Sequence, residues 1–144
     1  MPDRPLAGLP VILVEDDDDS REILEIALTA EGASVRTASG AEEALALFKA
    51  APPAIVLTDL SLSDRDGVWL LRQIRGLPGA AGVPVIAWTG RAFPHEREAI
   101  AAAGFDMHLV KPVDVHEMVA AITALTNIGG DDGDGASARR APER

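Results

Sequence analysis

The chain has 144 residues, 47% hydrophobic and 25% charged, which suits a single domain with a substantial core and excludes a disordered or fibrous protein. Its 23 acidic residues against 13 basic ones give a formal net charge of −10, which disfavours binding to nucleic acid or to anionic membranes. It has no cysteine, so disulfides and zinc–thiolate sites are excluded. Because neither a signal peptide nor an apolar run of membrane-spanning length is visible, we expect a cytoplasmic protein.

Short apolar runs alternate with amphipathic segments five times along the chain. The apolar runs predict strands at residues 11–14, 33–38, 54–57, 84–88 and 107–110. Apolar residues at helical spacing predict helices that end near Gly32, before residues 52–53, near Gly76, near Gly104 and before Asn127. Three helix starts are also marked: residues 39–42 have capping-box spacing, Pro94 suits a first turn, and Asp114 suits a cap.

This alternation predicts an α/β fold with a doubly wound, five-stranded, mostly parallel sheet, because parallel neighbours need helical crossovers. We expect one domain over residues 9–126, an N-terminal extension over 1–8 and a disordered tail over 127–144. In such folds ligands bind beyond the carboxyl ends of the strands, so the residues there are the first candidates for function.

Chemically complementary groups follow four of the predicted strands. They are an acidic block, an aspartate, a hydroxyl and an ammonium: residues 15–19, Asp59, Thr89 and Lys111. Within the block we single out Glu15 and Asp16, which directly follow a buried strand. The other three acids fit a helix cap and its dipole. Each group alone is commonplace, but together at one sheet edge they indicate a functional site.

The acidic residues predict a cation site. If Asp16 and Asp59 approach within about 4 Å, they repel each other by about 4 kcal/mol at an effective dielectric constant of about 20. A divalent cation would remove that repulsion. Hard oxygen ligands without His or Cys favour Mg²⁺ or Mn²⁺ over zinc. A carboxylate can also attack a phosphoryl group, provided that positive charge is held against the phosphoryl oxygens.

Four segments, in their order and spacing, resemble the receiver domain of bacterial two-component response regulators. They are residues 11–16, residues 56–60 followed by 66–67, residues 85–90 and residues 109–112. The resemblance covers the predicted domain, residues 9–126. It implies a flavodoxin-like fold with strand order 2-1-3-4-5 and a phosphoacceptor signalling module rather than an enzyme.

The resemblance also implies residue roles at the acidic end of the site. Asp59 would accept the phosphoryl group. Glu15 and Asp16 would hold Mg²⁺ together with Asp59, and Ser61 would add a ligand through its backbone carbonyl. A sensor histidine kinase or a phosphotransfer protein would supply the phosphoryl group.

On the opposite side of the site, the resemblance makes Thr89 and Lys111 the groups that contact the phosphoryl oxygens. Thr89 would also be the switch hydroxyl, and the peptide bond before Pro112 would be cis. Movement of Thr89 would change the face formed by the fourth helix, the fifth strand and the last helix. His108 lies on that strand, where many receivers have a rotating Tyr or Phe. Two alternatives stay open for it: a pH-sensitive part of the switch, or an exposed residue without a switching role.

A second departure lies in the loop after Asp59. Residues 62–63 are Leu-Ser, where the family often has Met-Pro. The change removes a rigid turn, which would loosen this loop.

The predicted domain leaves 18 residues after the last helix, at 127–144, too few for an effector domain. We therefore expect the signal to reach a separate, unidentified downstream protein, from a stand-alone regulator, a relay element or a receiver of hybrid-kinase origin. The sequence leaves homodimer formation open.

Two other classes fit less well. A phosphatase of the haloacid-dehalogenase type would need a second Asp two positions after the nucleophile, and that position is Ser61. A flavin- or nucleotide-binding module would need a phosphate loop after the first strand, where residues 15–19 are all acidic.

Overall fold

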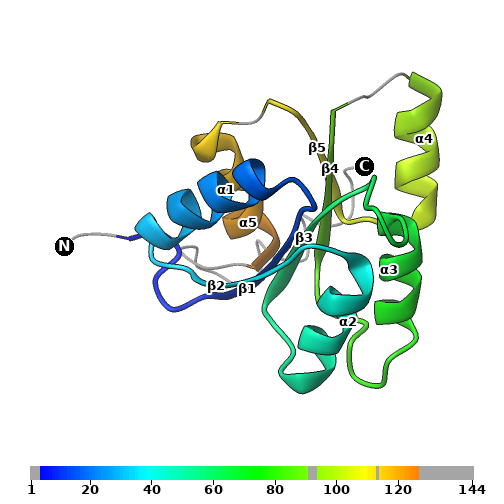
Figure 1. Cartoon of the computed structure of the whole chain (residues 1–144), viewed down its shortest axis with the longest axis horizontal. Helices are drawn as coiled ribbons and strands as arrows, with labels where there is room; N and C mark the ends of the chain where they lie inside the picture. Colours follow the sequence, from blue (N-terminus) through cyan, green and yellow to red (C-terminus); the bar gives the residue numbers. More distant parts are fainter. Residues whose placement is uncertain (1–3, 91–93, 113, 127–144) are drawn as a thin grey trace.

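The computed structural model describes residues 4–90, 94–112 and 114–126. Strands and helices alternate along the whole domain (Figure 1). The strands are β1 (Pro10–Val14), β2 (Ser34–Ala38), β3 (Ile55–Asp59), β4 (Val85–Thr89) and β5 (Met107–Val110). The helices are α1 (Asp18–Ala30), α2 (Ala41–Ala50), α3 (Gly67–Arg75), α4 (Pro94–Ala103) and α5 (Val115–Thr126).

The strands form one parallel sheet in the order β2-β1-β3-β4-β5, as predicted. β1 and β3 are neighbours in the sheet, with Leu13 opposite Leu57 and Val14 opposite Thr58. This register places the residues that follow β1 beside Asp59 at the end of β3. The sheet order β2-β1-β3 therefore brings together two acidic segments that are more than forty residues apart in the sequence.

The sheet is covered on both faces. Helices α1 and α5 lie against one face, and α2, α3 and α4 lie against the other (Figure 1). One cluster of buried side chains joins the α1/α5 layer to the sheet, with Leu28, Ile55 and Ile122 at 0% exposure. A second cluster joins the opposite layer, with Ile12 and Leu70 also at 0%. The near-continuous apolar strands of the sequence are thus explained by burial on two sides.

Most of the predicted helix starts and stops are found. Asp17 caps α1 by accepting a hydrogen bond from the Ser20 N–H (2.9 Å), and Asp114 accepts one from the Glu117 N–H (3.0 Å). Helix α4 begins at Pro94, and α3 ends before Gly76.

The capping box over residues 39–42 is wrong. The N-cap of α2 is Gly40, and it is Glu43, not Glu42, that accepts hydrogen bonds from the N–H and hydroxyl of Ser39. The helix begins one residue later than the spacing suggested, so the Glu42 side chain does not reach Ser39. The Glu42 side chain pairs with Arg65 in the loop after β3.

The segment before β1 packs against the domain. Leu6 is fully buried and its N–H donates to the carbonyl of Glu31 at 2.9 Å. The predicted tail, residues 127–144, lies outside the described residues. Within the described part of the chain, no helix combines the length and apolar character needed to cross a membrane.

Gly67 allows the start of α3 to pack against the end of β3. A Cβ atom there would lie 2.7 Å from the carbonyl oxygen of Asp59, a backbone atom that no rotamer change can move. We expect Gly67→Ala to lower the free energy of unfolding by about 1–3 kcal/mol in urea titrations. Gly82→Ala is the matched control, because nothing lies within 4 Å of the Cβ position at Gly82. Equal stability of the two variants would show that the contact at Gly67 is not tight.

Candidate functional site

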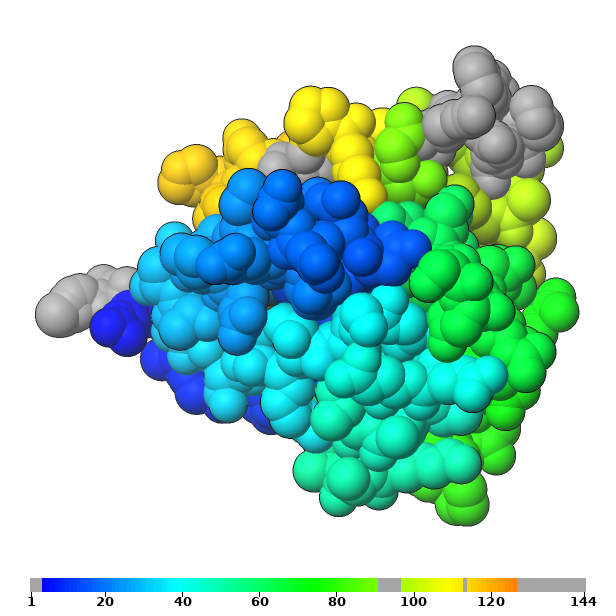
Figure 2. All heavy atoms as spheres, viewed as in Figure 1, coloured from blue at the N-terminus to red at the C-terminus, as the bar shows by residue number. Residues whose placement is uncertain are grey.

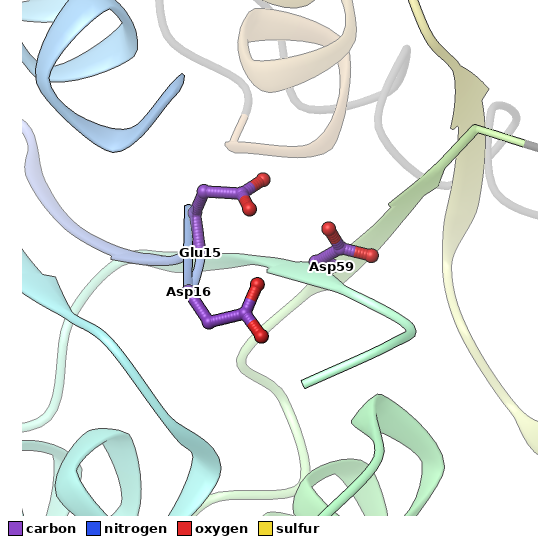
Figure 3. A group of neighbouring side chains, drawn as sticks. All are labelled: Glu15, Asp16 and Asp59. Carbon is purple, nitrogen blue, oxygen red and sulfur yellow. The ribbon is translucent and has the colours of Figure 1, made fainter. Parts of the chain in front are cut away.

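Three carboxylates meet at the carboxyl edge of the sheet. Glu15 and Asp16 follow β1, Asp59 ends β3, and the three side chains are neighbours at this edge (Figure 3). One carboxylate oxygen of each lies within 4.8 Å of the others. Glu15 and Asp59 are buried, at 1% and 6% exposure, whereas Asp16 is more exposed. The close approach of acids predicted from the strand ends is therefore present.

Lys111 lies among these carboxylates. Its Nζ is 2.7 Å from Asp59 Oδ2 and 3.1 Å from Glu15 Oε1. The peptide bond that follows it, to Pro112, is cis, as the resemblance implied. The backbone N–H of Lys111 donates to the carbonyl of Thr89 at 2.7 Å, which ties the end of β5 to the end of β4.

The pKa values of Glu15 and Lys111 are both raised, which favours the neutral form of the glutamate and the charged form of the lysine. Burial, aided by the nearby Asp59 carboxylate, raises the pKa of Glu15 above its ordinary value of 4.5, and the hydrogen bonds from the Asp17 N–H and from Lys111 only partly offset this. Burial works against the charged form of Lys111, but its hydrogen bonds to Asp59 and Glu15 outweigh this and raise its pKa. Lys111 is therefore firmly charged, and Glu15 binds a proton more readily than an exposed glutamate does.

Local hydrogen bonds orient Glu15. The Asp17 N–H donates to Glu15 Oε2 at 3.0 Å, so both oxygens of that carboxylate have a partner. The Arg21 guanidinium donates to the Glu15 carbonyl at 3.0 Å and pairs with Asp18 at 2.7 Å. Glu15 is thus fixed from α1 as well as from Lys111.

Ser61 lies close to Asp59 through its backbone. Its N–H donates to Asp59 Oδ1 at 3.0 Å, while the other oxygen, Oδ2, contacts Lys111. The Ser61 backbone therefore lies at the edge of the acidic cluster, and the carbonyl ligand that the resemblance implies at Ser61 stays a prediction.

Thr89 and His108 lie on the adjoining strands. Thr89 ends β4, is 8% exposed, and sits one residue beyond Trp88, the residue that pairs with Asp59 in the sheet register. His108 lies in β5 opposite Ala87 and is half-buried rather than exposed, while a switching role for it stays a prediction. Burial, followed by the positive charge of Arg97, lowers its pKa below 6.5. The neutral imidazole is favoured.

The sequence did not predict a role for two residues in or near the site. Trp88 is 5% exposed and the centroid of its ring is 4.6 Å from Lys111 Nζ, a cation–π contact with this ammonium. A large aromatic residue directly before Thr89 in a buried strand was the available signal. The second residue, Asp64, links the loop after β3 to α2 through two backbone hydrogen bonds. Nothing in the local spacing indicated that contact.

The donor set fits a small divalent cation. The three carboxylates have a formal charge of −3, and Lys111 pairs with two of them, Glu15 and Asp59, which leaves a formal charge of −2 in a partly buried site. The ligand atoms are hard carboxylate oxygens, which suit Mg²⁺ better than a softer metal. An ion of charge +2 would balance the remaining charge.

Comparison with known proteins identifies the family. A model of the response regulator receiver domain matches residues 11–123. The chain belongs to this family. Receiver domains are signalling modules of two-component systems rather than conventional enzymes, and the phosphoacceptor role of an aspartate comes with the family.

Curated relatives agree with this assignment. The receiver is 37% identical over 114 residues to an uncharacterized 14.6 kDa protein of Leptolyngbya boryana, with 79% of this chain and 87% of that one aligned. It is 37% identical to the transcriptional regulatory protein CseB of Streptomyces coelicolor and 35% identical to the response regulator MprA of Mycolicibacterium vanbaalenii. In both alignments 89% of this chain is covered, but only 56% and 55% of the relatives, so the chain spans about half their length.

Solved structures show the same CheY-like fold. A putative response regulator from Chloroflexus aurantiacus aligns with a TM-score of 0.79 at 28% identity, covering 83% of this chain and 98% of that one. The receiver domain of the sensor histidine kinase PA1611 from Pseudomonas aeruginosa aligns with a TM-score of 0.78 at 27% identity, covering 84% and 99%. That structure has a magnesium ion coordinated in its active-site cleft.

The raised pKa of Glu15 predicts a pH-dependent effect on stability. Because its pKa is higher in the folded protein, Glu15 favours folding below about pH 4.5 and loses that contribution as the pH rises through the folded value. Without metal, we expect Glu15→Gln to unfold at a higher urea concentration than the parent at pH 7, and this advantage to vanish near pH 4. Glu22→Gln, at an exposed position of α1, is the control. A Glu15→Gln protein less stable than the parent at pH 7 would mean that the Lys111 contact outweighs burial.

Proposed function

We propose that this receiver accepts one phosphoryl group on Asp59, with Mg²⁺ bound, from the phosphohistidine of a sensor histidine kinase or phosphotransfer protein. The observation that carries the proposal is the position of Asp59. It ends a central strand, lies within 4.8 Å of two further carboxylates, and contacts a charged lysine at 2.7 Å. A carboxylate in this setting is available as a nucleophile in a site that attracts cations.

The transfer joins an oxygen of Asp59 to the phosphorus atom and breaks the phosphorus–nitrogen bond of the donor histidine. The released imidazole takes up a proton. The receiver's own contribution is to hold the nucleophile and to place positive charge at the phosphoryl oxygens, which is how phosphoryl transfer is generally accelerated. Lys111 does this directly, since its Nζ already contacts the nucleophile.

The remaining polar residues have distinct proposed roles. Glu15 and Asp16 hold Mg²⁺ together with Asp59, and the carbonyl of Ser61 completes the protein ligands. When bound, Mg²⁺ neutralises charge on the phosphoryl oxygens. Thr89 donates its hydroxyl to one of those oxygens.

We further propose that phosphorylation switches the face formed by α4, β5 and α5, which a downstream protein reads. A phosphoryl group adds almost two negative charges and three acceptors, and this draws the Thr89 hydroxyl inward. The inward movement changes the space beside His108 on β5. Residues 9–126 act as the switching domain in this proposal.

Substitution of the nucleophile tests the proposal. With Mg²⁺ and acetyl phosphate, the parent protein should gain one acid-labile phosphoryl group by intact mass, and Asp59→Asn should gain none. Asp19→Asn is the control, because it removes an exposed acid of the same run, outside the cluster. If Asp59→Asn retained the full mass increase, another residue would be the acceptor.

A further inference from the structure

Asp64, in the loop between β3 and α3, binds the N-terminus of another helix. Its Oδ1 accepts a hydrogen bond from the N–H of Ala41 at 2.9 Å, and its Oδ2 accepts one from the N–H of Glu42 at 3.0 Å. Oδ1 also accepts from the N–H of Arg65 at 2.8 Å. Burial opposes ionisation here, but these hydrogen bonds dominate and hold the pKa of Asp64 below 3.8. The carboxylate is therefore charged at neutral pH.

Helix α2 has room for this carboxylate because its own N-cap is glycine. Gly40 provides no side-chain cap, and a Cβ atom there would lie 2.9 Å from Asp64 Oδ1. The free N–H groups of a helix N-terminus and its dipole favour a negative charge at this position. Asp64 thus serves α2 as a cap supplied from a different segment.

A weaker contact supports the same junction. Arg65 Nε lies 3.1 Å from Glu42 Oε2, and the Arg65 guanidinium stacks 4.7 Å from the centroid of the Trp69 ring in α3. The side chains of the Arg65–Glu42 pair are 49% and 60% exposed, so the pair itself contributes little. Figure 2 shows the green segment after β3 against the cyan surface of α2 on this face of the molecule.

The short segment between Asp59 and Asp64 is consequently held at both ends. At its start, the Gly67 N–H donates to the Leu60 carbonyl at 2.9 Å. At its far end, Asp64 is bound to α2. Between them lies Ser61, whose N–H contacts the Asp59 carboxylate. The loop has Leu-Ser at residues 62–63 and no proline, so these contacts, rather than a rigid turn, set its path.

We infer that Asp64 is a positioning residue for the acidic site. By binding the N-terminus of α2, it holds the β3–α3 loop so that the Ser61 peptide faces the carboxylate cluster. The inference rests on the proposed function, in which the Ser61 carbonyl is a Mg²⁺ ligand. Loss of Asp64 therefore weakens metal binding although Asp64 itself does not touch the metal.

A pair of matched variants tests this. Asp64→Ala removes the contact between the loop and α2. Glu43→Ala removes the hydrogen bonds to Ser39 at the same end of α2 and leaves the loop untouched. We expect Asp64→Ala to bind Mg²⁺ about tenfold more weakly by calorimetric titration, in line with the effect of losing groups that orient metal ligands. Glu43→Ala should bind as the parent does, and Asp64→Asn, which keeps an acceptor oxygen, should recover part of the loss.

A metal-free readout separates this inference from the proposed function. Without Mg²⁺, the Ser61 amide should exchange its hydrogen faster in Asp64→Ala than in the parent, and at the parent's rate in Glu43→Ala. If the parent bound no Mg²⁺, the proposed function would fail and the exchange rates would still decide the role of Asp64. Unchanged Ser61 exchange in Asp64→Ala would overturn the inference. Equal effects of Asp64→Ala and Glu43→Ala would also overturn it, since they would reflect only the stability of α2.

Discussion

The Lys111 ammonium lies between two buried carboxylates, and the rest of the site depends on this interaction. The order of the parallel sheet forces Glu15 and Asp59 together, 2.7–3.1 Å from Lys111 Nζ, in a place where water cannot fully screen their repulsion. One ammonium cannot balance these two groups and Asp16 together. In the proposed function, this residual negative charge attracts a divalent cation, and the cation together with Lys111 then supplies the positive charge that the phosphoryl oxygens require.

Holding these buried carboxylates close together lowers the stability of the folded state, and other interactions of the fold must offset this. The acids are held from several sides: Glu15 by the Asp17 N–H, Asp59 by the Ser61 N–H, and Lys111 by the face of Trp88. Burial of the apolar strands beneath both helical layers stabilises the sheet that carries them. The charged edge of the sheet therefore opposes stability, whereas the apolar centre of the sheet supplies it.

The sequence predicted the parts of the site that depend on strand order and missed those that depend on contacts between distant loops. Asp59 and Lys111 could be placed because apolar runs mark the strands and parallel strands align their carboxyl ends. Asp64 is separated from its partners in α2 by 22 or 23 residues along the chain, so no local sequence pattern predicts this contact. The predicted capping box was wrong for a related reason. Glu42 and Glu43 are adjacent, and the exact residue at which the helix begins determines which of them reaches Ser39.

The central claim is that the carboxylate cluster carries uncompensated negative charge that a divalent cation relieves. The most direct measurement is the free energy of unfolding as Mg²⁺ is added at constant ionic strength. The account predicts that stability rises with Mg²⁺, approaching about 1.4 kcal/mol per tenfold increase once the ion exceeds its dissociation constant. Sodium chloride at matched ionic strength should not reproduce the rise. Equal stability in the two salts would contradict the account.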